Sequence, residues 1–404
     1  MSLLPDSTLQ SGLAAVQSAL KDTGAVGFLQ VDRGDTPSRR YLTRTSGANR
    51  ETALVVLPAT ASHRPQAVYC VPNDSTAAAK AFVHADDRID RSVVGRPPSA
   101  ATGRHVCKLL ADRLGEQAGS GRLLVPRDLP HDAAVFCQQT GYELQSTAAV
   151  RAGRASKTLA ERDCLTAVQQ AAGGGLARGE AVLAASNQDG GTLSFNGQLL
   201  SAERLCRLID TALVSAGVAP AENTQVGAPT ESTDALPVGE PIRLRVAPRG
   251  PHGYHGTLTR TVVIDSDGGW ERRAYIAAEA GLQAAVGHIE PGVDVSTVKN
   301  EALAEVGAYG FAITPDGEST QPRATAAVHG VGLSAHEWPT PGAESTLQVG
   351  TVIAVETGVV DTPQRTVRLG TLHVVTAEGC QQLVEYPFAI TPIDRGDDGG
   401  TKTD

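Results

Sequence analysis

The first 150 residues alternate short apolar runs with stretches whose apolar side chains recur at helical spacing. Four runs rich in valine and leucine predict β-strands, at 24–31, 52–58, 67–72 and 122–126. Three longer stretches predict helices, at 75–85, 101–115 and 131–141. This alternation predicts an α/β domain in which helices cover a sheet.

The stretch before the first predicted strand is amphipathic. Its apolar side chains fall on one helical stripe, namely Leu9, Leu13, Val16 and Leu20. Asp6 or Ser7 can open this helix, and Gly24 can close it. A basic segment and a continuous apolar core, which an export signal needs, are both missing. We therefore expect a surface helix of the mature fold.

After residue 155 the pattern changes to long helices and long strands. Four stretches predict helices, at about 157–187, 201–216, 271–288 and 296–309. A hairpin is predicted at 241–264 and strands at 351–360 and 366–379, after a Pro/Gly/Thr-rich connection at 218–241. The triple glycine at 173–175 is expected to interrupt the first of these helices, because glycine weakens helices.

These patterns divide the chain into two domains and a tail. We expect a smaller α/β domain at 1–152 and a larger domain at 153–393, which makes the chain α/β (α+β) overall. The polar, glycine-rich segment at 394–404 is expected to be disordered.

Composition narrows the class of protein. The net charge of −9 over 404 residues leaves no basic excess to neutralise phosphates, so we expect no nucleic-acid partner. No run of 18 apolar residues occurs, so no membrane span is expected. The six cysteines are scattered without a CxxC pair, which favours reduced, mostly buried thiols of a cytoplasmic protein.

Two histidines and a glutamate are the candidates for chemistry. His329 and His336 lie seven residues apart around Gly330 and Gly332, a spacing that predicts one shared pocket. Glu356 interrupts an apolar strand, and a buried carboxylate is costly unless a partner compensates its charge. Glu356 is therefore expected to have a partner.

The order of motifs resembles the pita-bread peptidases, which include prolidase, aminopeptidase P and methionine aminopeptidase, with creatinase as a metal-free relative. The resemblance runs through the residues at 254–261 (YHGTLTRT), 329–339 (HGVGLSAHEWP), 352–358 (VIAVETG) and 367–379 (VRLGTLHVVTAEG), and covers roughly residues 155 to 392. It implies a C-terminal pita-bread domain with a curved antiparallel sheet backed by helices. The N-terminal residues resemble the smaller creatinase/aminopeptidase-P domain.

The resemblance also implies five positions that hold a pair of divalent metals through two Asp, one His and two Glu. Hard oxygen ligands with one imidazole suit Mn, Co or Zn. His329 and Glu356 are retained, whereas Arg245, Thr257 and Gly370 stand at the other three positions. The resemblance therefore predicts a degenerate metal site, with no cofactor expected; Mn, Co or Zn is the alternative if the site works.

Further site residues follow from the resemblance. His336 matches a histidine that contacts substrate and transfers protons in the family. Tyr254, His255, Arg245 and Thr257 are the candidates for substrate contact.

We also expect Arg245 to replace the metals electrostatically. A guanidinium fork suits bidentate contact with a carboxylate, so we predict an Arg245–Glu356 ion pair, either direct or bridged by one water, with an added hydrogen bond from His329.

Three functions remain open. The first is a catalytically impaired homologue of Xaa-Pro dipeptidase or aminopeptidase P, a pseudoenzyme that binds a peptide or small metabolite. The second is a metal-independent amide or amidino hydrolase similar to creatinase or ectoine hydrolase, with His329, His336 and Glu356 as its working groups. The family usually has a further histidine in the connection before the hairpin, and residues 226–241 contain no counterpart, which weakens the analogy with creatinase. The third is an Xaa-Pro peptidase with an unusual metal site. The resemblance also allows a homodimer.

Overall fold

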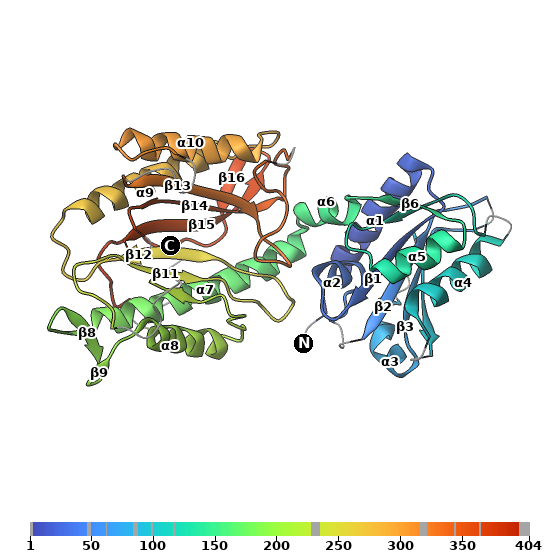
Figure 1. Cartoon of the computed structure of the whole chain (residues 1–404), viewed down its shortest axis with the longest axis horizontal. Helices are drawn as coiled ribbons and strands as arrows, with labels where there is room; N and C mark the ends of the chain where they lie inside the picture. Colours follow the sequence, from blue (N-terminus) through green and yellow to red (C-terminus); the bar gives the residue numbers. More distant parts are fainter. Residues whose placement is uncertain are drawn as a thin grey trace. The chain divides into compact units, whose positions relative to one another are not determined.

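The chain folds into two units, each with its own sheet (Figure 1). The computed structural model describes residues 3–46, 50–61, 63–83, 88–97, 100–115, 118–227, 235–314, 321–342, 345–362 and 365–395. The units comprise residues 1–161 and 162–404. Arg395, near the start of the predicted tail, forms an ion pair with Glu180, while residues 396–404 lie outside the described residues.

The N-terminal unit contains a mixed six-stranded sheet in the order β4-β3-β2-β1-β5-β6. Its strands are β1 (Gly27–Arg33), β2 (Glu51–Leu57), β3 (Gln66–Pro72), β4 (Asp90–Arg96), β5 (Arg122–Val125) and β6 (Glu143–Ser146). Its helices are α1 (Asp6–Thr23), α2 (Pro37–Thr43), α3 (Thr76–Ala79), α4 (Thr102–Leu114), α5 (His131–Gln139) and α6 (Ala149–Ala155). The predicted α/β class is confirmed.

Sequence patterns located most of these elements. The four predicted strands are confirmed as β1, β2, β3 and β5, and α1 begins at Asp6 and is closed by Gly24 in a left-handed conformation. The single helix predicted at 75–85 is wrong, because the described part consists of α3 between short 3₁₀ turns η1 (Asn73–Ser75) and η2 (Lys80–Phe82). The edge strands β4 and β6 are too polar to have been predicted.

The C-terminal unit is built on an antiparallel sheet in the order β10-β11-β12-β15-β14-β13, with β16 paired to β15. The strands are β10 (Gln225–Val226), β11 (Ile242–Val246), β12 (Leu258–Val262), β13 (Arg323–Gly330), β14 (Val352–Val360), β15 (Thr366–Thr376) and β16 (Gly379–Gln382). The helices are α7 (Leu159–Ala184), α8 (Ala202–Ser215), α9 (Trp270–Gly287) and α10 (Val295–Ala308). A small separate sheet consists of β7 (Asn187–Asp189), β8 (Thr192–Phe195) and β9 (Gln198–Leu199).

One face of the large sheet is covered by helices (Figure 1). Alternate residues of β14, such as Ile353 and Val355, join a core with α9 and α10, while Leu244 of β11 joins a second core with α7 and α8. Because successive side chains of a strand point to opposite faces, Glu356 and Arg245 lie on the other face. Among the helices that the structure describes, none has the length and apolar character needed to cross a membrane.

Helix α7 runs unbroken through the triple glycine, so the predicted interruption is wrong. A Cβ atom at Gly175 would lie 2.5 Å from Leu213 Cδ2 of α8. At Gly179 it would lie 2.9 Å from Ile209 Cδ1 of the same helix. These two glycines let α7 and α8 approach closely, and this packing offsets the weak helix propensity of glycine.

The first turn of α7 carries a reciprocal cap. The Thr158 amide and hydroxyl each donate a hydrogen bond of 2.9 Å to the Glu161 carboxylate, and the Glu161 amide donates one of 3.3 Å to the Thr158 hydroxyl. This capping box satisfies two amides that a helix start leaves without partners. The division between the two units falls between Glu161 and Arg162, inside this turn.

His373 on β15 is expected to make stability depend on pH. Burial lowers its pKa from the ordinary value of 6.5 to about 4, and its exposed fraction is 3%. Between these two pH values the unfolded chain binds a proton at this position and the folded chain does not, so stability falls as pH falls from 6.5 to 4. The loss from this one group should approach about 3 kcal/mol.

Denaturant unfolding at pH 7 and pH 4.5 measures this effect. The His373→Gln variant should lose less stability between these two pH values than the unmodified chain. An equal loss in both proteins would show that His373 does not cause it.

Candidate functional site

The face of the C-terminal sheet that lies opposite the helices carries a cluster of polar side chains across five strands. We call it the Glu356 face and define it by Arg243, Arg245, Thr259, Thr261, His329, Glu356, Arg368 and Gly370. Strand register places Arg245 opposite Thr259, Thr259 opposite Gly370, and Gly370 opposite Glu356. Residues far apart in sequence are thereby aligned in one row across β11, β12, β15 and β14.

A second row lies two residues further along these strands. Arg243 is opposite Thr261, and Arg368 is opposite Gly358. The Thr261 hydroxyl joins the two pairs, since it donates to the Arg368 carbonyl (2.9 Å) and accepts from the Arg368 amide (2.8 Å). Rows two residues apart face the same side of a sheet. Three arginines therefore share this face with Glu356.

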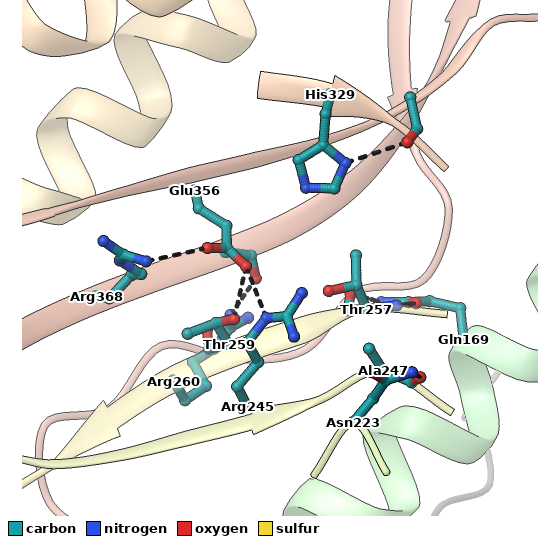
Figure 2. A network of polar contacts seen from close by, with 12 residues as sticks. Gln169, Asn223, Arg245, Ala247, Thr257, Thr259, Arg260, His329, Glu356 and Arg368 are labelled. Atoms are coloured by element: carbon teal, nitrogen blue, oxygen red, sulfur yellow. Dashed lines mark hydrogen bonds and ion pairs between the residues drawn. The ribbon is translucent and has the colours of Figure 1, made fainter. Parts of the chain in front are cut away.

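Both carboxylate oxygens of Glu356 have partners (Figure 2). Oε1 lies 3.4 Å from Arg245 Nε and accepts a hydrogen bond of 3.0 Å from the Thr259 hydroxyl, and Oε2 lies 3.7 Å from Arg368 Nη1. The Glu356 side chain is 7% exposed. Burial opposes its ionisation, but Arg245, Arg368 and His329 together outweigh burial and hold its pKa below the ordinary value.

The predicted Arg245–Glu356 ion pair is thus confirmed, and Arg368 is a second cationic partner that the sequence reasoning missed. The available signal was the position of Arg368 two residues before Gly370 in VRLG. This spacing puts both residues on one face of β15.

The two candidate histidines lie against each other. The ring centroids of His329 and His336 are 4.0 Å apart with an interplanar angle of 28°, so the rings stack. His329 is buried and His336 is exposed. Burial is the main cause that lowers the pKa of both imidazoles, helped by His336 at His329 and by Arg245 at His336. Their predicted proximity is confirmed, and both rings favour the neutral form.

The hydrogen bond predicted from His329 to Glu356 is not formed. Among the described residues, the hydrogen-bond partner of the His329 ring is the Gly330 carbonyl, 3.1 Å from Nδ1 (Figure 2). His329 therefore lowers the pKa of Glu356 only through space, when its imidazole is protonated, and not through a direct contact.

The other candidates lie in the hairpin before β12. The His255 amide donates to the Gly332 carbonyl at 2.8 Å, which ties the YHG segment to the HGVG segment. Both Tyr254 and Thr257 are buried. The Thr257 main chain is fixed by Gln169, which donates to its carbonyl (2.8 Å) and accepts from its amide (2.9 Å). The Thr257 hydroxyl is buried and has no partner among the described residues.

The sequence profile of metallopeptidase family M24 matches residues 203–377, which contain every strand of the Glu356 face. The C-terminal unit therefore resembles the M24 metallopeptidases over these residues. The predicted relationship to the pita-bread peptidases is confirmed.

Relatives of the chain include Xaa-Pro dipeptidases. That of Pyrococcus furiosus is 28% identical over 137 residues, and the alignment spans 33% of this chain and 36% of that relative. The match thus covers about a third of the curated relative's length.

Solved structures share the whole two-domain fold. Dipeptidase PepE from Mycobacterium ulcerans has a TM-score of 0.74 at 22% identity, with 96% of this chain and 99% of that chain covered. An Xaa-Pro dipeptidase from Bacillus anthracis has a TM-score of 0.74 at 17% identity, with 95% and 99% covered. The predicted fold class is confirmed.

Gly370 fits its row of the Glu356 face because it has no side chain. A Cβ atom at this position would lie 2.8 Å from Glu356 Cγ and 3.2 Å from Thr259 Cβ. Gly370→Ala is therefore expected to destabilise the chain by about 1–3 kcal/mol, since the neighbours are packed on both sides.

The matched control is Gly287→Ala at the end of α9, where no heavy atom lies within 4 Å of an added Cβ. This variant should unfold at the same denaturant concentration as the unmodified chain, or slightly higher. If Gly370→Ala also unfolded at that denaturant concentration, the close approach of Glu356 and Thr259 to Gly370 would not contribute to stability.

Across the described ranges, no group of three or more His, Cys, Asp or Glu side chains is placed to hold a metal ion.

Proposed function

We propose that this chain is a metal-independent protein that binds a peptide or small metabolite and has little or no Xaa-Pro peptidase activity. One observation carries the proposal. The carboxylate of Glu356, one of the two ligand positions that the family resemblance retains, is engaged on both oxygens by Arg245, Thr259 and Arg368. Guanidinium groups thus neutralise the charge that metals neutralise in the family.

A pair of divalent cations does not suit this set of side chains. Such a pair brings four positive charges and needs several hard oxygen ligands. The Glu356 face offers one carboxylate and one imidazole, and Arg245 and Arg368 already lie within 4 Å of that carboxylate. Metal binding would have to displace these arginines or tolerate their repulsion. We therefore derive no catalytic step through a metal.

A metal-independent amide or amidino hydrolase is the second candidate. The stacked rings of His329 and His336 favour it, because a neutral imidazole can accept a proton from water or from a substrate. His336 is the exposed member of the pair and is the better placed to meet a substrate. In this scheme Glu356 would orient a cationic substrate group.

Metal analysis with a dipeptide assay tests the proposal. After dialysis the protein should retain less than stoichiometric Mn, Co or Zn, and EDTA should leave its melting temperature unchanged. Ala-Pro and Gly-Pro should not be cleaved with any of the three metals added. Two retained metal equivalents together with Ala-Pro turnover would refute the proposal and would favour the third function, an Xaa-Pro peptidase with an unusual metal site.

The same preparation distinguishes the second candidate. The hydrolase would be favoured if the metal-free protein hydrolysed an amide or amidino substrate and if His329→Asn and His336→Asn each abolished that hydrolysis. Retained hydrolysis in both variants would exclude these histidines as its acid–base groups.

A further inference from the structure

Positive charge exceeds negative charge on the Glu356 face. Arg243, Arg245 and Arg368 share it with Glu356, the one carboxylate among the residues that define the face. Three guanidinium charges against one carboxylate leave an excess of two positive charges. Arg368 is 30% exposed at the side chain and Arg245 is 13% exposed, so solvent reaches the cluster.

Of the three arginines, Arg243 is the one that forms no ion pair with Glu356 among the described residues. Its Nε atom is buried and has no hydrogen-bond partner within the part of the chain that the structure describes. Burial, together with the neighbouring charges of Arg368 and Arg245, lowers the pKa of Arg243, whereas Glu356 raises it. A buried guanidinium N–H without an acceptor is costly, and a bound anion would supply that acceptor.

The strand geometry brings Arg243 and Arg368 to the same place. Both flank Thr261, Arg243 through the β11–β12 register and Arg368 through two hydrogen bonds to the Thr261 hydroxyl. Guanidinium groups recognise the oxygens of phosphates and carboxylates in a bidentate manner. Arg245 lies in the adjacent row of the same face and adds its charge to the cluster.

We propose that the Glu356 face binds a doubly charged oxyanion, such as the phosphate group of a small metabolite, through Arg243 and Arg368 with support from Arg245. A dianion balances the excess of two positive charges, whereas a single carboxylate would leave one charge uncompensated. This inference rests on the metal-independent binding role proposed above and specifies its ligand class.

Calorimetric titration of the purified full-length chain with inorganic phosphate tests the inference. Ionic strength is held constant with chloride, and acetate is titrated in parallel. Phosphate should bind, and acetate should bind at least about tenfold more weakly, since one fewer charge is neutralised. Equal or tighter binding of acetate would overturn the assignment to a dianion. No heat from phosphate above the chloride background would overturn the site itself.

Arg243→Gln is the decisive variant, because it removes a guanidinium while it leaves every contact of Glu356 in place. Phosphate affinity should fall by about tenfold or more. Arg178→Gln is the matched control: it removes one exposed positive charge from α7 and should leave affinity unchanged. Equal phosphate affinities of the two variants would refute the role of Arg243. The comparison of phosphate with acetate uses the unmodified chain, so it does not depend on whether either variant folds.

Metal content separates this inference from the proposed function. A metal-free protein that fails to bind phosphate contradicts the anion site and leaves the metal-independent role standing. Two retained metal equivalents contradict the role itself.

Discussion

Glu356→Gln is expected to destabilise the C-terminal unit by about 3–5 kcal/mol. The substitution keeps the volume of the side chain and removes its charge. Arg245 and Arg368 would then lie on the Glu356 face without a carboxylate partner, and Arg243 nearby would add to their repulsion. The cost arises from leaving charges buried and uncompensated, and it does not imply that the ion pairs are a net gain over apolar packing.

Tryptophan fluorescence during urea unfolding measures this loss selectively. Both tryptophans of the chain, Trp270 and Trp338, lie in the C-terminal unit. Glu203→Gln on α8 is the control, since Glu203 pairs with Arg207 where both side chains are exposed. A pair of this kind contributes less than about 1 kcal/mol. Similar shifts of the unfolding midpoint in both variants would show that the charge of Glu356 contributes no more to stability than the charge of an exposed glutamate.

Arg260→Met is expected to cost at least about 3 kcal/mol, because several buried acceptors lose their donor together. The Arg260 side chain is fully buried. It donates four hydrogen bonds of 2.6 to 3.2 Å to main-chain carbonyls, those of Thr259, Gly370, Tyr386 and Pro387. Its guanidinium also lies over the Phe388 ring, 4.2 Å from the centroid. Arg260 thus fastens the C-terminal segment to β12 and β15.

Two measurements test this role. Urea unfolding should show the lost stability, and limited proteolysis should cleave near residue 386 in the variant before it cleaves the parent. Arg204→Met is the control, because Arg204 donates to three carbonyls of the β8–β9 region from a half-buried position, whereas Arg260 is fully buried. Resistance of Arg260→Met to proteolysis at the parent level would contradict the fastening role.

Local periodicity was sufficient to predict the helices of the C-terminal unit. The stretches at 271–288 and 296–309 correspond to α9 and α10 within one residue at each end. The resemblance to the pita-bread peptidases also brought Arg245, His329 and Glu356 to one site, because the LTRT and HGVGL segments align the chain with the family's motifs. Predictions of this kind succeed where the residues concerned are close in sequence or lie within a recognisable motif.

The remaining part of the site depends on the register between strands that are distant in sequence. Arg368 reaches Glu356 because residue 370 of β15 lies opposite residue 356 of β14. The VRLG spacing places Arg368 on the same face as Gly370 but does not encode this register between strands. The family resemblance marks Gly370 as a lost carboxylate, whereas its neighbours in the structure leave no room for a Cβ atom. Packing of this kind becomes visible when three strands are placed together.

The capping box at the start of α7 affects which residue should begin a fragment that contains the C-terminal unit alone. A fragment that starts at Arg162, where the compact unit begins, would lack both Thr158 and Glu161 and would leave the first turn of the helix without its cap. Loss of such a cap costs about 1 kcal/mol. A fragment that starts at Lys157 retains both residues and should be expressed with a more stable first helix than one cut five residues later.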